Sequence, residues 1–327
     1  MDTILVLLHT DGGISKAGLE AVSAARAFGG EVVIGLVGGD VDGAAEPVAG
    51  AGRVLGVAGD EFAQARYATD AAAAEALVKA SGAGIVLAPS TSRWARCLAG
   101  VAGRMGGRVD THVTGFTGGN VTRWYYRQRI EATFARVERP WFVLLEAGSC
   151  AGYATGGGEC VVERVPVDVS SRTVIKGVVS PQSGEQTIKP EAELLFVAGA
   201  GWTKKQKDGA VHVEQAGELI LGFLRGSDAS LGSSKSLVDL SGEGHAVLPF
   251  LSHLNQVGQT GSTPRHPKGL ATCCHGEEPH VVGWRFIQDR RAVNLDANCG
   301  WARGKSDVLY VADAFAVMEE VNRLLKG

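Results

Sequence analysis

Two short stretches of this chain combine hydroxyl groups, amides and glycines in a pattern suited to holding a ligand. The segment "GSSKSLVD" (232–239) follows an apolar run that predicts a strand, and serines in that position can donate hydrogen bonds to a pyrophosphate. The segment "NQVGQTG" (255–261) contains two glycines that would let backbone N–H groups approach a ligand closely, although the same composition suits a simple turn. We therefore treat the two stretches together as parts of one candidate site.

Polar side chains elsewhere in the second half extend this constellation, and each also has a plainer interpretation. A lone histidine such as His280 is more often a surface or core residue than a cofactor contact. Asp313 precedes a helical pattern, where it is an adequate N-cap without any ligand. Lys235 suits a solvated loop charge, and Asn294 beside Asp296 suits turn chemistry. The order of the elements along the chain, rather than any single residue, favours a binding function.

In that order the elements resemble the alpha subunit of electron-transfer flavoproteins. The most specific match is "QVGQTG" (256–261), which follows the "G-x-S-[basic]-x-x-V-D" element matched by "GSSKSLVD". The segments "AARAFGGEVV" (24–33) and "GIVLAPSTSR" (84–93) agree with the family in the first half, so the resemblance spans nearly the whole chain. It implies an electron carrier that contains FAD and pairs with a beta subunit. Such a carrier accepts electrons from a flavin-dependent dehydrogenase and passes them to a quinone reductase or another acceptor, and it is not a substrate-transforming enzyme.

The resemblance also implies roles for individual residues. Ser234 and Lys235 fall where the family places a serine and a basic residue beside the phosphates and the flavin ring. Gln259 and Thr260 fall near the flavin O4 and N5 edge, and His280 falls near the pyrimidine C2 carbonyl. A flavin that takes up single electrons needs a hydrogen-bond donor at N5 and positive charge near N1 and O2. Thr260, His280 and Lys235 are residues of those types.

Other positions complete the cofactor-binding set that the resemblance implies. Asn294 and Asp313 match residues that serve the adenosine half of FAD in the family, and His275 stands where a serine is usual. The whole set is Ser234, Lys235, Gln256, Val257, Gly258, Gln259, Thr260, His275, His280, Asn294 and Asp313.

The chain departs from the family's pattern at two places in this set. Lys235 stands where arginine is usual, and it keeps the charge but loses the planar guanidinium. The segment "CCHGEEPH" (273–280) carries two glutamates in a stretch that normally wraps the phosphates. These departures leave open an alternative function, in which an alpha-like subunit has lost or weakened FAD binding and serves as a structural or docking partner. A third hypothesis, an enzyme that uses a bound nucleotide, lacks an evident nucleophile–base pair or metal set.

The elements that would position this site alternate between apolar runs and amphipathic runs, which predicts α/β architecture. In the first half we expect strands at 3–9, 31–38 and 83–90 and helices at 15–30, 71–82 and 93–107. Residues 109–147, including the segment "PWFVLLEAG", predict antiparallel edge strands. In the second half we expect strands at 192–202 and 228–234 and helices at 214–226 and 313–327.

These elements divide into two doubly wound domains. We expect an N-terminal Rossmann-like domain of the adenine-nucleotide-hydrolase type, with its linker, over 1–190, and the family resemblance gives it a role in subunit association. We expect a C-terminal, FAD-binding, Rossmann-like domain over 191–327.

Composition narrows the functional classes further. The net charge is −3 over 327 residues, and the chain lacks a long basic block, which argues against nucleic-acid binding. The N-terminal segment "MDTILVLLH" lacks the positive region of an export signal, and no apolar run reaches membrane-spanning length, so we expect a cytoplasmic protein that is not membrane-embedded. The six cysteines include no C-x-x-C unit, so we expect reduced thiols and no metal site.

Overall fold

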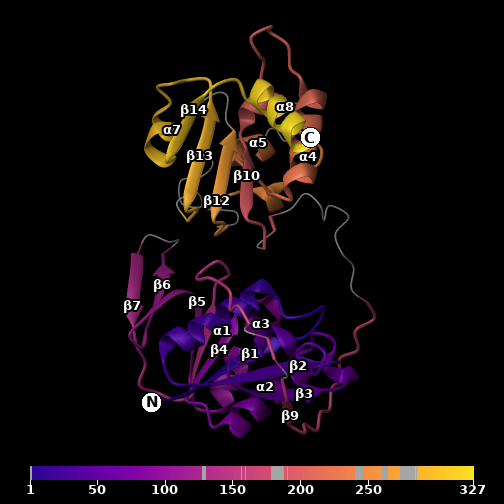
Figure 1. Cartoon of the computed structure of the whole chain (residues 1–327), viewed down its shortest axis with the longest axis vertical. Helices are drawn as coiled ribbons and strands as arrows, with labels where there is room; N and C mark the ends of the chain where they lie inside the picture. The colour runs from indigo at the N-terminus through magenta and orange to yellow at the C-terminus, as the bar shows by residue number, and fades with distance from the viewer. Residues whose placement is uncertain are drawn as a thin grey trace. The chain divides into compact units, whose positions relative to one another are not determined.

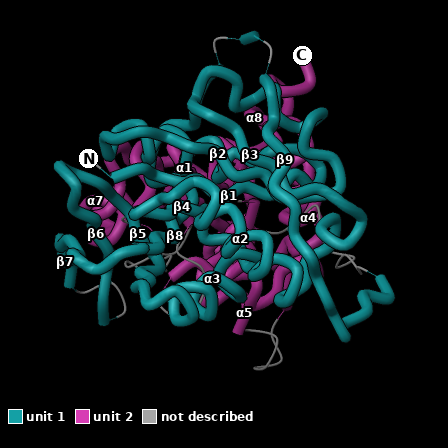
Figure 2. Tube along the Cα trace, turned by 90° about the horizontal axis from the view of Figure 1, so that it is seen from below, with its two compact units in different colours: residues 1–178 teal, residues 179–327 magenta. Residues whose placement is uncertain are grey.

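The computed structural model describes residues 2–126, 130–155, 157–158, 160–177, 188–189, 191–239, 246–258, 264–272, 284 and 286–327. The chain separates into two compact units, Met1–Val178 and Val179–Gly327, which Figure 2 shows in different colours. Each unit contains its own sheet and its own hydrophobic core.

The described part of the N-terminal unit forms one nine-stranded sheet with the order β7-β6-β5-β8-β4-β1-β2-β3-β9 (Figure 1). Its strands are β1 (Thr3–His9), β2 (Glu31–Gly38), β3 (Arg53–Ala58), β4 (Ile85–Pro89), β5 (Arg108–Thr117), β6 (Asn120–Tyr125), β7 (Ile130–Phe134), β8 (Trp141–Leu145) and β9 (Val162–Arg164). Its α-helices are α1 (Lys16–Phe28), α2 (Tyr67–Ser81) and α3 (Ser92–Arg104).

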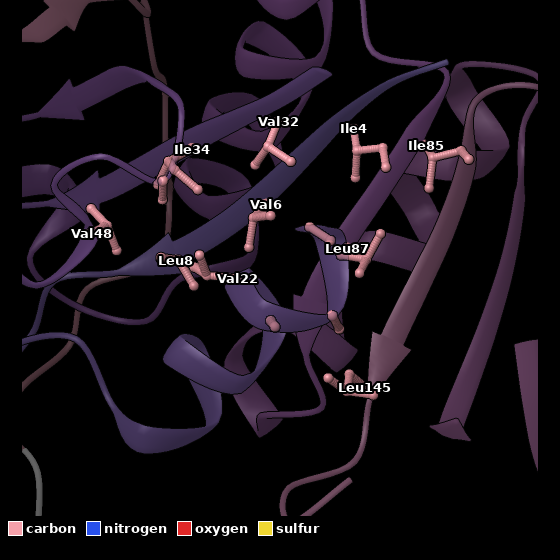
Figure 3. Packing of buried hydrophobic residues seen from close by; sticks show 14 of the residues in the cluster. Ile4, Val6, Leu8, Val22, Val32, Ile34, Val48, Ile85, Leu87 and Leu145 are labelled. Carbon is pink, nitrogen blue, oxygen red and sulfur yellow. The ribbon is translucent and has the colours of Figure 1, made fainter. Parts of the chain in front are cut away.

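Helices cover both faces of this sheet, because the central strands are apolar on both sides. Alternate residues of β1, including Ile4 and Leu8, pack in one cluster with Val22 of α1, as Figure 3 shows. The intervening residues, including Leu5, pack in a second cluster with residues of α2 and α3 such as Trp94. Strands buried on both faces read as continuous hydrophobic runs. The expected doubly wound α/β domain is confirmed.

The strand Trp141–Leu145 corrects one expectation. We expected this segment to be an antiparallel edge strand, but β8 lies inside the sheet and pairs in parallel with both β4 and β5. All five of its residues are buried, as a strand covered on both faces requires. The antiparallel edge is instead made by β6 and β7, where the side-chain hydroxyls of Thr122 and Thr133 hydrogen-bond across the strands at 2.9 Å.

The C-terminal unit is also doubly wound. Its described strands are β10 (Leu194–Ala198), β11 (Ser230–Ser233), β12 (Lys268–Thr272), β13 (Asp289–Asn294) and β14 (Val308–Val311), and its α-helices are α4 (Val213–Ser227), α5 (Lys235–Asp239), α7 (Gly300–Lys305) and α8 (Ala314–Leu325). The sheet is parallel, with the order β11-β10-β12-β13-β14. Helices α4 and α8 share the core on one face, and α7 packs against the other. Within the described residues, no helix is both long and apolar enough to cross a bilayer.

Candidate functional site

The strand order of the C-terminal sheet marks the edge where a ligand is expected. The chain leaves β10 for β11 on one side and reaches β12 on the other, so the winding reverses between β10 and β12. In open α/β sheets, ligands bind outside the carboxyl ends of the strands at such a reversal. Of the candidate residues that the structure describes in this unit, Ser234, Lys235, Asn294 and Asp313 lie at or just beyond carboxyl ends of strands, and 256–258 pair beside the end of β11.

The two glycine-containing stretches lie side by side at the end of β11. Ser233 forms a parallel bridge with Gln256, and the backbone N–H of Val257 donates to the carbonyl of Ser233 at 3.0 Å. The Asn255 side chain donates to the carbonyl of Leu231 at 3.2 Å. Gln256 and Val257 are therefore buried against the strand, as parts of one local structure with "GSSKSLVD".

Glycine is required at two positions of this local structure. A Cβ added at Gly232 would lie 2.6 Å from Cγ2 of Val257, so any side chain there would push the loop away. Gly258 has a φ of 133°, a backbone conformation that side-chain-bearing residues rarely adopt. The remaining loop residues Gln259 and Thr260, together with His275 and His280, lie outside the described residues.

Ser234 and Lys235 occupy the turn that leads from β11 into α5. Ser234 is fully buried; its backbone N–H donates to the Ala198 carbonyl at 2.9 Å, and its hydroxyl oxygen accepts from the backbone N–H of Leu237 at 3.3 Å. Lys235 is about half exposed and forms an ion pair with Asp239 on the same helix. Ser234 therefore holds the carboxyl ends of β10 and β11 together, and Lys235 places a cation beside them.

Two buried polar atoms at the strand ends have no hydrogen-bond partner among the described residues. These are the hydroxyl oxygen of Ser233, on β11, and Nδ2 of Asn294, on β13. Both side chains are at most 1% exposed. Leaving such a group unpaired costs about 1–3 kcal/mol. A polar ligand seated at this edge would satisfy both atoms, so the residues fit a bound cofactor.

Turn and capping chemistry is present at the other predicted positions. The Asn294 Oδ1 accepts from the backbone N–H of Asp296 at 2.8 Å, so only its NH₂ group is left for a ligand. The Asp313 carboxylate accepts from the N–H groups of Phe315 and Ala316 at 2.9 and 3.2 Å and caps α8. The structure therefore gives Asn294 a role in the turn and Asp313 a role as the cap of α8, and neither role needs a ligand.

A tryptophan–threonine pair at the strand reversal is a feature that the sequence analysis missed. The Trp202 Nε1 donates to the Thr272 hydroxyl at 2.8 Å, and that hydroxyl donates to the Val197 carbonyl at 3.3 Å. Trp202 is fully buried and packs on the ring of Phe315. The pair ties the end of β12 to the turn after β10. A threonine as the last residue of an apolar strand is the signal that could have drawn attention to it.

A family model described as the Electron transfer flavoprotein domain matches residues 3–170, just over half of the chain. The chain belongs to the electron transfer flavoprotein family. The expected resemblance to the alpha subunits of this family is confirmed over nearly the full length. The chain is 27% identical over 337 residues to the electron transfer flavoprotein subunit alpha of Syntrophomonas wolfei, with 99% of each chain covered. The family model covers most of the N-terminal unit, whereas the similarity to the bacterial subunit also includes the candidate site.

Proposed function

We propose that this chain is the FAD-containing alpha subunit of an electron transfer flavoprotein and works as a heterodimer with a beta subunit. It accepts electrons from a flavin-dependent dehydrogenase and passes them to a quinone reductase or another acceptor. It carries electrons and transforms no substrate of its own. Family membership and the full-length similarity to an alpha subunit support this proposal.

The observation that carries the FAD assignment is the pair of unpartnered polar atoms, Ser233 Oγ and Asn294 Nδ2. They lie on β11 and β13, on either side of the β10/β12 reversal, at the edge where nucleotide cofactors bind in this topology. If no ligand bound at this edge, each of these buried atoms would lack a hydrogen bond, which lowers the stability of the protein.

The residues around this edge divide the cofactor between them. Ser234 and the backbone of 256–258 hold the phosphate and ribityl region, and Asn294 and Asp313 hold the adenosine half. Gln259, Thr260 and His280 contact the flavin ring, with Lys235 adding positive charge and His275 replacing the usual serine. The bound flavin supplies one-electron redox chemistry, and these donors stabilise negative charge where it develops.

The two domains have separate roles in the heterodimer. The N-terminal domain with its linker, residues 1–190, associates with the beta subunit, and residues 191–327 carry the cofactor. The heterodimer works in the cytoplasm. An alpha-like docking subunit without FAD is the competing function, and the departures at Lys235 and 273–280 motivate it.

The test is co-expression with the beta subunit, followed by purification and a visible spectrum. We expect a flavin spectrum and stepwise reduction by single electrons. A colourless complex that cannot be reconstituted with FAD would favour the docking subunit. Direct two-electron reduction without a one-electron stage would contradict the role as a single-electron carrier.

A pair of asparagine variants tests the site itself. Asn294→Ala removes the buried NH₂ group, and we expect FAD affinity to fall about tenfold or more, which corresponds to about 1.4 kcal/mol. Asn298→Ala, on the same turn but exposed, is the matched control and should keep wild-type affinity. Equal FAD affinity in the two variants would place the adenosine half elsewhere.

A further inference from the structure

The N-terminal sheet has its own strand-order reversal, which the proposed function does not use. The order β4-β1-β2 places the reversal between β1 and β4. A cavity of about 200 Å³ opens at the carboxyl ends of these two strands. Its wall includes Leu8 and His9 at the end of β1 and Pro89 at the end of β4. This is the edge where an open α/β sheet binds ligands.

Two helices begin at this cavity. Ser15 caps α1 and Thr91 caps α3, and both caps line the cavity. Each cap accepts from one N–H group of the first turn, that of Gly18 at 3.2 Å and that of Trp94 at 3.4 Å. The other first-turn N–H groups have no intrahelical acceptor, and the helix dipole adds partial positive charge at this end. Both α1 and α3 therefore favour an anion here.

Side chains in the cavity wall carry polar atoms without partners. Among the described residues, none forms a hydrogen bond with Nδ1 or Nε2 of His9 or with Nε1 of Trp94. The two rings stack with their centroids 3.8 Å apart, and Trp94 is fully buried. Three unpaired nitrogen atoms in one wall are an independent indication that the cavity holds a polar ligand.

The charges around the cavity favour an anionic ligand at the His9 end. Burial, reinforced by the positive charges of Arg93 and Arg96, lowers the pKa of His9 to about 2, while the nearby Val37 carbonyl opposes the shift without meeting hydrogen-bond geometry. The imidazole is therefore neutral and lies in a positive potential.

One negatively charged side chain also lines the cavity. Among the described residues of the wall, Asp11 is the one carboxylate, and it forms an ion pair with Arg93. The pairing compensates much of its charge, but the remaining repulsion gives the site a residue whose removal should strengthen anion binding.

We propose that this cavity binds a small oxyanion, a phosphate or carboxylate head group with only a few further atoms. A volume of about 200 Å³ exceeds the ~30 Å³ that one water occupies and is below the ~300–1,000 Å³ of pockets for drug-sized ligands. The helix N-termini bind the oxyanion, and the single N–H of the neutral His9 ring and the Nε1–H of Trp94 provide donors in the wall. This site is separate from the edge of the C-terminal sheet proposed to hold FAD.

The test uses the full chain labelled with 5-fluorotryptophan and observed by ¹⁹F NMR. The Trp94 resonance is assigned by its loss in Trp94→Phe. Sodium phosphate and sodium acetate are titrated separately at constant ionic strength, with chloride as the balancing anion. We expect a saturable shift of the Trp94 resonance with at least one of the two. A response to phosphate alone identifies a tetrahedral oxyanion, and a response to acetate identifies a carboxylate.

Two variants with opposite expected effects make the test specific. His9→Phe keeps the stacked ring but removes both nitrogens, and we expect the dissociation constant to rise about fivefold. Asp11→Asn removes the repulsive charge. We expect the dissociation constant of the anion to fall about three- to tenfold in this variant, consistent with a charge pair a few ångströms apart at the protein surface. Asp11→Asn provides the decisive comparison if His9→Phe folds poorly.

The outcomes that overturn the proposal are equally definite. The first is no saturation by either anion below about 100 mM, where binding is worth only about 1.4 kcal/mol. The second is a saturable shift that is the same in Asp11→Asn as in the wild type, because the ion would then bind away from this cavity.

Discussion

The two units have the same kind of strand reversal but differ in how its polar groups are satisfied. In the N-terminal unit, the guanidinium of Arg93 donates to the buried Asp70 carboxylate at 2.8–3.1 Å and to the Phe62 carbonyl at 2.6 Å. In the C-terminal unit, the uncharged groups of Ser233 and Asn294 have no partner among the described residues. Both reversals leave some buried polar atoms without a partner among the described residues, but the N-terminal one is also braced by a buried ion network.

This difference shows which parts of a binding site the topology provides and which the side chains provide. Topology places strand ends and helix N-termini together in both sheets. The side chains at that edge then determine how many of its polar groups pair with one another and how many are left for a ligand. At its described strand ends, the N-terminal unit combines a charged ion network with a small cavity, while the C-terminal unit has small residues and uncharged buried polar groups. Similar folds can therefore host different functions.

The largest predicted effect is on the ion network of the N-terminal unit. Asp70 is fully buried between Arg93 and Arg96, so Asp70→Ala leaves the guanidinium of Arg93 buried without its main counter-charge. We expect the free energy of unfolding of this unit to fall by about 3–5 kcal/mol. Urea denaturation followed by circular dichroism measures the change.

An ion pair on the same helix is the control for that variant. Glu75 pairs with Lys79 and Arg104 at the surface of α2. We expect Glu75→Gln to cost less than about 1 kcal/mol. Similar losses in the two variants would mean that the network is not what holds this reversal together.

The next largest effect is predicted at the loop of the candidate cofactor site. Gly258→Ala forces a side chain onto a backbone with φ of 133°, which costs about 1–3 kcal/mol or displaces the loop. We expect a lower ratio of flavin to protein after gel filtration. Gly300→Ala, at the open first position of α7, should keep the wild-type ratio and stability. Full flavin retention in Gly258→Ala would exclude a role for the loop backbone in binding.

Ser233→Ala is predicted to have two smaller effects of opposite sign, a more stable FAD-free protein and weaker FAD binding. Removing an unpaired buried hydroxyl should raise the stability of the FAD-free protein by about 1 kcal/mol, because the cost of desolvating it disappears. The same change should weaken FAD binding. Thr10→Val, which removes another unpaired buried hydroxyl in the other unit, should leave FAD binding unchanged. Thermal melting and FAD titration measure both quantities. A loss of stability together with unchanged FAD affinity in Ser233→Ala would contradict the assignment.

The smallest effect concerns an exposed pair in the N-terminal unit. The hydrogen bond that His112 Nδ1 donates to the Glu146 carboxylate at 2.7 Å raises the pKa of His112 above its ordinary value of 6.5. The contribution of the His112–Glu146 hydrogen bond to the free energy of unfolding is therefore complete below about pH 6.5. It is lost as the pH rises through the pKa of His112 in the folded protein. Because His112 is largely exposed, we expect less than about 1 kcal/mol. Urea denaturation at pH 6 and pH 8 should show this difference, and His112→Gln should abolish it.

Much of the fold could be predicted because apolar runs mark buried strands. The predicted strands at 3–9 and 31–38 match β1 and β2 to the residue. The strand β3 (Arg53–Ala58) was missed because glycines stand before, inside and after it, at Gly52, Gly56 and Gly59, so the segment looked like a turn-rich stretch. The segment of β8 was assigned to the wrong place in the sheet, although its unbroken apolar run already indicated a strand with two covered faces.

The candidate site could be predicted only in outline. Sequence order brought "GSSKSLVD" and "NQVGQTG" into one hypothesis, and the structure places Ser233 beside Gln256. Which polar atoms remain unpaired depends on neighbours that are distant in sequence. The same is true of the hydrogen bond between Trp202 and Thr272, which are 70 residues apart. No local pattern encodes such pairings.

The contiguity of the two units along the chain has a consequence for synthesis. The edge of the N-terminal sheet is completed by β9, which pairs with β3, and no later strand joins that sheet among the described residues. All of Met1–Val178 can therefore leave the ribosome and fold while Val179–Gly327 is still being translated. At ~5–20 residues per second this interval lasts roughly 7–30 s, long compared with the folding of most single domains. A folded N-terminal unit would then be present at the ribosome before the C-terminal sheet has all its strands.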